Sequence, residues 1–176
     1  VREGGAEYMK FADNDILDLY PLEDLTITLW FKSSYDRVLN PLEGLIGKKN
    51  SQGTVDKGYI VFRVGNDPNI YLKLANDNTA LGVKTWNENN LEWRFFAFTI
   101  YRNGTCLLYT NGFPVKNIAC GEFDGNDLSN SKKLYLGAIE AYGNPIAFLN
   151  GSIDEVRIYK RSLSENEIRA LYDQKE

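Results

Sequence analysis

Histidine is absent from the 176 residues, and this absence excludes whole classes of function. A Ser-His-Asp triad uses an imidazole as its base, so a hydrolase of that kind is excluded. Zinc centres with His ligands are excluded too, and the two cysteines, Cys106 and Cys120, are too few for a site of four thiolates. Any metal site must therefore consist mainly of oxygen ligands, which calcium and magnesium prefer.

The chain also lacks a basic excess and a long apolar run. Lys and Arg number 20 against 24 Asp and Glu, and the net charge of −4 disfavours nucleic acid as a partner. No apolar run approaches the roughly 20 residues of a transmembrane helix. No signal peptide is visible and the first residue is Val1, so we expect a mature chain or an excised domain. Cys106 and Cys120 fit either one disulfide or two free thiols, so they do not indicate a compartment.

Strand patterns fill the chain almost to its end. The segment LTITLWFK alternates, which places Leu25, Ile27 and Leu29 on one face. Asn111-Gly112, between two apolar runs, predicts a two-residue hairpin turn. Further strands are predicted over 58–65, 69–75, 92–101, 133–137 and 151–159. Many short strands with frequent turns are typical of an antiparallel sandwich, so we predict an all-β fold of two sheets and a single domain over 1–176.

One short helix is predicted near the C-terminus, in LSENEIRALY. Ser164 is a suitable N-cap, and Glu167 completes a capping box. Ile168, Leu171 and Tyr172 then form an apolar stripe at helical spacing. We expect this helix to dock on the surface of the sandwich.

The last predicted strand, within NGSIDEVRIY, contains an acid on an unexpected face. Alternation places Asp154 on the same face as the apolar residues two and four positions later. A buried carboxylate needs a cation or backbone N–H donors to offset its desolvation. Calcium takes about 6–8 oxygen ligands, and Asp13, Asn14 and Asp15 supply such oxygens near the N-terminus. We predict a structural calcium shared by Asp154 and one or two of these three residues. The alternative is that Asp154 caps a turn and the 13–15 run is a solvated loop.

The sequence offers no convincing pair of catalytic carboxylates. The pattern nearest to a glycoside hydrolase motif is EFDGND, with Glu122, Asp124 and Asp127. Gly125 and Asn126 interrupt the strand that would have to present the acids together, so a polar loop is the favoured interpretation. No catalytic residue is assigned, and we do not expect an enzyme.

Sugar binding often uses exposed aromatic side chains, because their faces cover the C–H face of a pyranose. The best candidates are Trp86, in VKTWNENN, and Tyr142, in the Gly/Asn/Pro loop EAYGNPIAF; Tyr35 is a third. Asn87 and Asn144 can donate to and accept from sugar hydroxyls. The alternative for each aromatic residue is that it anchors its own loop.

A series of segments carries a family resemblance. In chain order they are YMKFADNDILDL, LTITLWFK, LIGKK, GYIVF, EWRFFAFTIY, LLYTNGFPV, LYLG and, most specifically, LNGSIDEVRIYKRSLSENEIRALY. The series resembles the laminin G-like jelly roll of the concanavalin A-like lectin/glucanase superfamily. One departure is Trp93-Arg94, where the family usually has Trp-His at a generally structural position.

The resemblance implies a two-sheet jelly-roll sandwich with a non-catalytic recognition role. Many members of the family hold a calcium near the first strand and the Asp of the last strand. The resemblance therefore implies that Asp154, the corresponding residue here, is a calcium ligand. We therefore expect a module that binds a glycan or polysaccharide, as part of a larger secreted or cell-surface protein, with a structural calcium. A protein-interaction or adhesion domain of the same fold is the alternative, because one fold serves many ligands. A glycoside hydrolase ranks third, because the sequence lacks a convincing pair of catalytic carboxylates.

Overall fold

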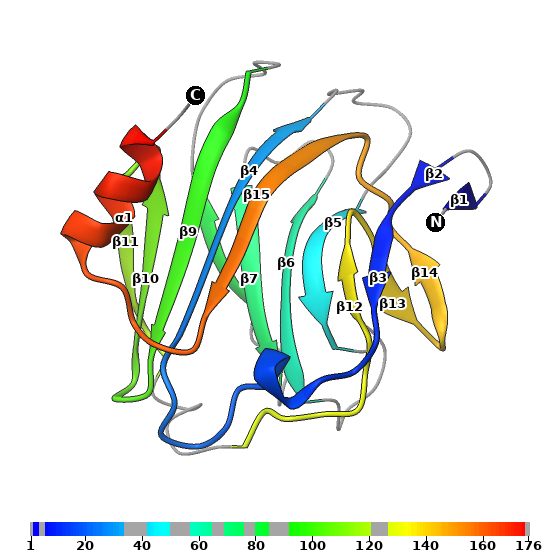
Figure 1. Cartoon of the computed structure of the whole chain (residues 1–176), viewed down its shortest axis with the longest axis horizontal. Helices are drawn as coiled ribbons and strands as arrows, with labels where there is room; N and C mark the ends of the chain where they lie inside the picture. The colour runs from blue at the N-terminus through cyan, green and yellow to red at the C-terminus, as the bar shows by residue number, and fades with distance from the viewer. Residues whose placement is uncertain are drawn as a thin grey trace. The chain divides into compact units, whose positions relative to one another are not determined.

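The computed structural model describes residues 2–3, 6–33, 42–49, 57–64, 69–75, 80–84, 92–120 and 127–174 (Figure 1). The chain divides into two compact units, each assembled from three separate stretches. Unit 1 comprises Val1–Asp18, Ser33–Leu91 and Leu128–Ser152. Unit 2 comprises Leu19–Lys32, Glu92–Asp127 and Ile153–Glu176.

Unit 1 is built on a six-stranded sheet with the order β3-β12-β5-β6-β7-β8. Its strands are β3 (Met9–Phe11), β5 (Leu42–Lys48), β6 (Gly58–Val64), β7 (Asn69–Ala75), β8 (Ala80–Lys84) and β12 (Leu134–Leu136). Two small pairs accompany it, β1 (Arg2–Glu3) with β2 (Ala6–Glu7) and β13 (Ile139–Ala141) with β14 (Asn144–Ile146). A 3-10 turn, η1, covers Asp15–Leu17. Neighbouring strands pair antiparallel throughout.

Unit 2 holds a five-stranded sheet with the order β11-β10-β9-β4-β15, and a helix beside β11 (Figure 1). The strands are β4 (Leu25–Ser33), β9 (Arg94–Tyr101), β10 (Thr105–Thr110), β11 (Phe113–Ala119) and β15 (Gly151–Tyr159); the helix α1 covers Glu165–Asp173. The predicted all-β class, with antiparallel sheets and one C-terminal helix, is confirmed.

Strand β4 is buried on both faces. Leu25, Ile27 and Leu29 on one face are fully buried, as their alternation predicts. On the other face, Trp30 stacks on Tyr172 of α1, with 5.7 Å between ring centroids. Buried Ile168 joins the same cluster, so the apolar stripe of α1 covers this face of the sheet.

Helix α1 begins with the predicted capping box. The Ser164 hydroxyl oxygen accepts from the Glu167 backbone N–H, and the Glu167 carboxylate accepts from the Ser164 N–H at 2.8 Å. Arg161 donates to the same carboxylate at 2.6 Å. Hydrogen bonds from Arg161 first, and then from Ser164, lower the pKa of Glu167 to about 2.

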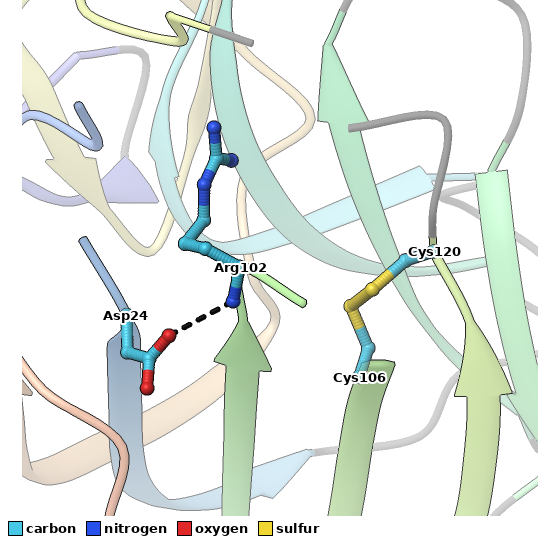
Figure 2. Close-up of a disulfide and its surroundings, with 4 residues drawn as sticks. All are labelled: Asp24, Arg102, Cys106 and Cys120. Atoms are coloured by element: carbon cyan, nitrogen blue, oxygen red, sulfur yellow. Dashed lines mark hydrogen bonds between the residues drawn. A yellow bond between two sulfur atoms is a disulfide. The ribbon is translucent and has the colours of Figure 1, made fainter. Parts of the chain in front are cut away.

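The two cysteines form a disulfide within unit 2 (Figure 2). Cys106 lies on β10, and Cys120 directly follows its partner strand β11. The Cys120 N–H also donates to the Gly104 carbonyl at 2.8 Å, so a covalent and a hydrogen-bonded link close this end of the hairpin. Nearby, Asp24 accepts from the Arg102 N–H at 2.8 Å and fixes the turn after β9.

The predicted hairpin turn joins β10 to β11. Asn111 and Gly112 have φ angles of 51° and 77°, which is the pair of positive values that a type I′ turn requires. The Asn111 side-chain oxygen accepts from the Phe95 N–H at 3.1 Å, so the turn is also tied to β9.

Candidate functional site

The strand pair β13–β14 presents an aromatic side chain at its tip. Tyr142 and Gly143 form the two-residue turn, with φ angles of 50° and 81°. A Tyr with positive φ is uncommon, so the surrounding structure must hold it there. The region predicted as a Gly/Asn/Pro loop is a tight hairpin, with Tyr142 in the turn between two three-residue strands. Pro145 is unusual in a strand, and Tyr-Gly lacks the Asn or Asp usual in such turns, so the sequence does not signal these strands.

The base of the β13–β14 hairpin is fixed to β5. The Gly44 N–H donates to the Ala147 carbonyl at 2.7 Å, and the Asn150 N–H donates to Glu43 Oε1 at 3.1 Å. Gly44 also approaches Ile139 so closely that a Cβ on it would collide with that buried side chain. The hairpin therefore has little freedom to shift against the sheet.

A buried aromatic cluster supports the same base. Tyr8 stacks on Tyr135 with 6.0 Å between ring centroids, and Phe148 packs on Tyr8 at 5.8 Å. Ala138, immediately before β13, is buried in this cluster. The residues that flank the hairpin are thus anchored, and β13 contacts both β12 and β5.

The tip of the hairpin is open. Tyr142 is 73% exposed, and a Cβ on Gly143 would meet no atom within 4 Å. Asn144 is exposed, and its side-chain amide donates to the Tyr142 carbonyl at 3.3 Å. Two of the predicted sugar-binding residues, Tyr142 and Asn144, therefore meet at one exposed tip. The other two, Trp86 and Asn87, lie outside the described residues, as does Tyr35.

The inward orientation predicted for Asp154 is wrong. Asp154 is exposed, and its carboxylate accepts from the adjacent Glu155 N–H at 2.8 Å. Glu155 has a φ of 48° inside β15, and such a residue interrupts the alternation of a strand. No burial cost therefore calls for a cation at Asp154.

The predicted N-terminal calcium ligands have other partners. Asp13 pairs with the Lys48 ammonium at 2.7 Å, and the Asn14 side chain accepts from the Ile16 N–H at 3.0 Å as the N-cap of η1. Asp15 is exposed in the first turn of η1. Within the described ranges no three acidic or cysteine side chains gather as a metal site. These contacts do not fit a calcium shell, and the calcium stays a prediction.

The buried acids of unit 1 have basic partners. Glu43 lies 3.2 Å from Arg63, and Glu140 lies 4.0 Å from Lys132. Both carboxylates are nearly inaccessible to solvent, which suits ion pairs that stabilise the fold. Of the EFDGND motif, Glu122 and Asp124 lie outside the described residues, while Asp127 is half-buried.

The laminin G family model, described as the concanavalin A-like lectin/glucanases superfamily, matches residues 3–169. The chain belongs to this superfamily. A curated relative is Paraclostridial mosquitocidal protein 1 of Paraclostridium bifermentans, 24% identical over 172 residues. That match covers 91% of the chain but 13% of the relative, so the chain spans a small part of that protein's length.

Solved structures show the same superfamily fold. The CBM40 of Ruminococcus gnavus IT-sialidase superposes with a TM-score of 0.69 at 21% identity, covering 86% of this chain and 84% of that one. The botulinum neurotoxin serotype G binding domain superposes with a TM-score of 0.71 at 16% identity, covering 97% of this chain and 41% of that one. The predicted concanavalin A-like jelly roll is thereby confirmed.

Proposed function

We propose that this chain is a non-catalytic carbohydrate-recognition module, and that the tip of the β13–β14 hairpin contacts the glycan. The observation that carries the proposal is Tyr142, a 73% exposed aromatic side chain on an anchored hairpin. Its ring can cover the apolar face of a pyranose while its hydroxyl stays hydrated. Because the hairpin is already fixed, binding costs little additional ordering of the chain.

Asn144 adds polar capacity beside the ring. Its amide donates to the Tyr142 carbonyl in the free protein, and the amide group still has another donor and an oxygen acceptor. A sugar hydroxyl can use both groups.

Sialylated glycans are the class we propose to test first. Solved relatives include the R. gnavus CBM40 bound to α2,3 sialyllactose and to α2,6 sialyllactose. Another is the botulinum neurotoxin serotype D ligand-binding domain in complex with N-acetylneuraminic acid. The shared fold motivates the choice of probe, and only a measurement on this chain assigns the ligand.

A glycan array tests the proposal. It includes both sialyllactoses, lactose and neutral polysaccharides, and compares the wild type with Tyr142→Phe, Tyr142→Ala and Phe113→Ala. Phe113 is a matched control, since it is 57% exposed but lies in unit 2. We expect Tyr142→Phe and Phe113→Ala to bind the same glycans as the wild type. We expect Tyr142→Ala to lose glycan binding on the array. An unchanged signal with Ala at 142 rejects the hairpin as the contact, and sugar release from any probe rejects the non-catalytic role.

Protein recognition by the same fold is the second candidate. One solved relative, the botulinum neurotoxin DC binding domain, was determined in complex with rat synaptotagmin II. The same exposed Tyr142 would suit a protein surface, since Tyr is enriched at such interfaces. A blank array, together with a defined protein that binds the wild type and not Tyr142→Ala, favours this candidate.

We also propose an extracellular location, as part of a longer protein. The Cys106–Cys120 disulfide supports this proposal, because such bonds persist mainly in oxidising compartments. The described part of the chain contains no helix long and apolar enough to cross a bilayer. Recovery of the oxidised form from a culture medium would support the location, and a fully reduced protein in the cytosol would contradict it.

A further inference from the structure

A lysine side chain lies at the centre of a buried polar network in unit 1. The Lys48 side chain, at the end of β5, has no solvent exposure. Its ammonium nitrogen lies 2.7 Å from Asp13 Oδ1, 2.7 Å from Asp18 Oδ1 and 2.5 Å from the Asn130 carbonyl oxygen. An ammonium has three N–H donors, and three oxygens from two distant chain segments receive them.

We infer that the Lys48 ammonium is the structural cation of the N-terminal segment, in the role that the sequence suggested for calcium. Three oxygens at these distances saturate an ammonium. Calcium instead takes about 6–8 oxygens at about 2.3–2.6 Å. Asp13, a predicted calcium ligand, is therefore already neutralised by a charge that belongs to the chain.

The surrounding contacts hold the cation in place. Asp18 is buried, and its Oδ1 also accepts from the Asn130 N–H at 3.1 Å. The Asn130 side-chain amide donates to the Lys48 carbonyl at 3.1 Å and to the Lys57 carbonyl at 2.9 Å. The residue that supplies the third oxygen thus also clamps the backbone on both sides of the 49–56 segment.

A tyrosine closes the network on the N-terminal side. The Tyr59 hydroxyl donates to the Leu17 carbonyl at 3.0 Å, one residue before Asp18. Burial first, and the negative charge of Asp18 second, raise the pKa of Tyr59, so this hydroxyl stays a donor. Two side chains, Lys48 of β5 and Tyr59 of β6, therefore hold Asp13, Asp18 and η1.

The first test removes the ammonium and keeps most of the side-chain volume. Lys48→Met leaves Asp18 buried without its cation, and we expect the melting temperature to fall by about 6–20 °C. The control is Lys133→Met, because Lys133 is exposed and directly precedes β12. We expect the control to melt like the wild type. A Lys48→Met protein that also melts like the wild type overturns the inference.

A double-mutant cycle separates charge pairing from lost packing. Asp18→Asn and Lys48→Met are measured singly and together, and we expect the double variant to lose less than the sum of the single losses. Strictly additive losses overturn the inference.

A milder variant keeps the test decisive if Lys48→Met fails to fold. The Asp13 side chain is 38% exposed, so Asp13→Asn removes only one negative charge at the edge of the network. We expect Asp13→Asn to melt a few degrees lower than the wild type and Asp15→Asn to leave melting unchanged. Equal effects of the two variants contradict the inference.

Calcium binding provides an independent readout. In equilibrium dialysis with calcium chloride, we expect the wild type and Asp13→Asn to take up the same amount of metal, because Lys48 already neutralises Asp13. Calcium uptake by the wild type that Asp13→Asn abolishes overturns the inference, since Asp13 would then be a metal ligand.

Discussion

Two threonines in β4 differ in one respect that makes a sharp test of how unit 2 is stabilised. Both Thr26 and Thr28 are fully buried on the same face of the strand. The Thr26 hydroxyl donates to the Arg161 carbonyl at 2.9 Å and accepts from the Leu163 N–H at 3.0 Å. It also lies 3.3 Å from the Thr99 hydroxyl. The Thr28 hydroxyl has no hydrogen-bond partner among the described residues.

Replacement of each threonine by valine keeps shape and strand preference while it removes the hydroxyl. Thr26→Val leaves the buried Leu163 N–H unsatisfied and releases the segment that leads into α1. A buried donor without a partner costs about 1–3 kcal/mol, and the lost bond to the Arg161 carbonyl adds to this, so we expect a loss of about 2–4 kcal/mol. Thr28→Val removes a buried polar group that gains nothing in the fold. We therefore expect no loss, and up to about 1 kcal/mol of stabilisation.

Urea unfolding followed by tryptophan fluorescence measures both values. Trp30 is buried against α1, so its emission reports on the region concerned. Equal slopes against urea concentration are needed, since they show that the same surface is exposed in every variant. Comparable losses for the two valine variants would refute the reasoning, because the hydrogen bonds of Thr26 would then contribute nothing measurable.

Three further predictions concern the disulfide, the helix cap and two glycines. Reduction of Cys106–Cys120 should cost about 3 kcal/mol of unfolding free energy, the value for a loop of about 15 residues, and dithiothreitol should not affect a Cys106→Ala/Cys120→Ala variant. Because the pKa of Glu167 falls from 4.5 to about 2 on folding, its stabilisation is complete above pH 4.5 and is lost as pH falls through 2. The gap in melting temperature between wild type and Glu167→Gln should therefore narrow over that range, and a gap that is constant with pH contradicts the assignment. Gly112→Ala should lower the melting temperature more than Gly143→Ala: both have positive φ, but only the Cβ at 112 meets another side chain, at 3.0 Å.

Features set by local chemistry were predictable from the sequence. Asn111-Gly112 specifies its turn because both residues tolerate positive φ. Ser164 and Glu167 specify the start of α1 because each satisfies a donor of the other. The alternation in β4 places Leu25, Ile27 and Leu29 on one buried face because the period of a strand is fixed.

Features set by distant contacts were not predictable in this way. Tyr142 adopts its positive φ in a hairpin whose base is held by β5 through Gly44. The positive φ of Glu155 interrupts the alternation of β15 beside Asp154, and neither Glu155 nor a residue directly next to it is a glycine that would signal this break. Two partners of Lys48 are distant in sequence: Asp18 lies 30 positions away and Asn130 lies 82 positions away. No local pattern therefore connects them with Lys48.

The predicted exposure of Tyr142 is confirmed, whereas the predicted inward orientation of Asp154 is wrong. The two predictions were based on different kinds of sequence signal. Tyr142 is followed by Gly143 and Asn144, and polar or flexible neighbours of this kind are common at surfaces. Asp154 was assigned by counting along a strand, and a single irregular residue invalidates such a count.

The most direct test of the central claim is a titration of the folded chain with the glycan that gives the strongest array signal, measured by calorimetry alongside Tyr142→Phe and Tyr142→Ala. The account predicts that the wild type and Tyr142→Phe bind the glycan saturably, that Tyr142→Ala does not, and that the glycan is intact after the titration. The absence of saturable binding to any glycan by the folded protein would contradict it.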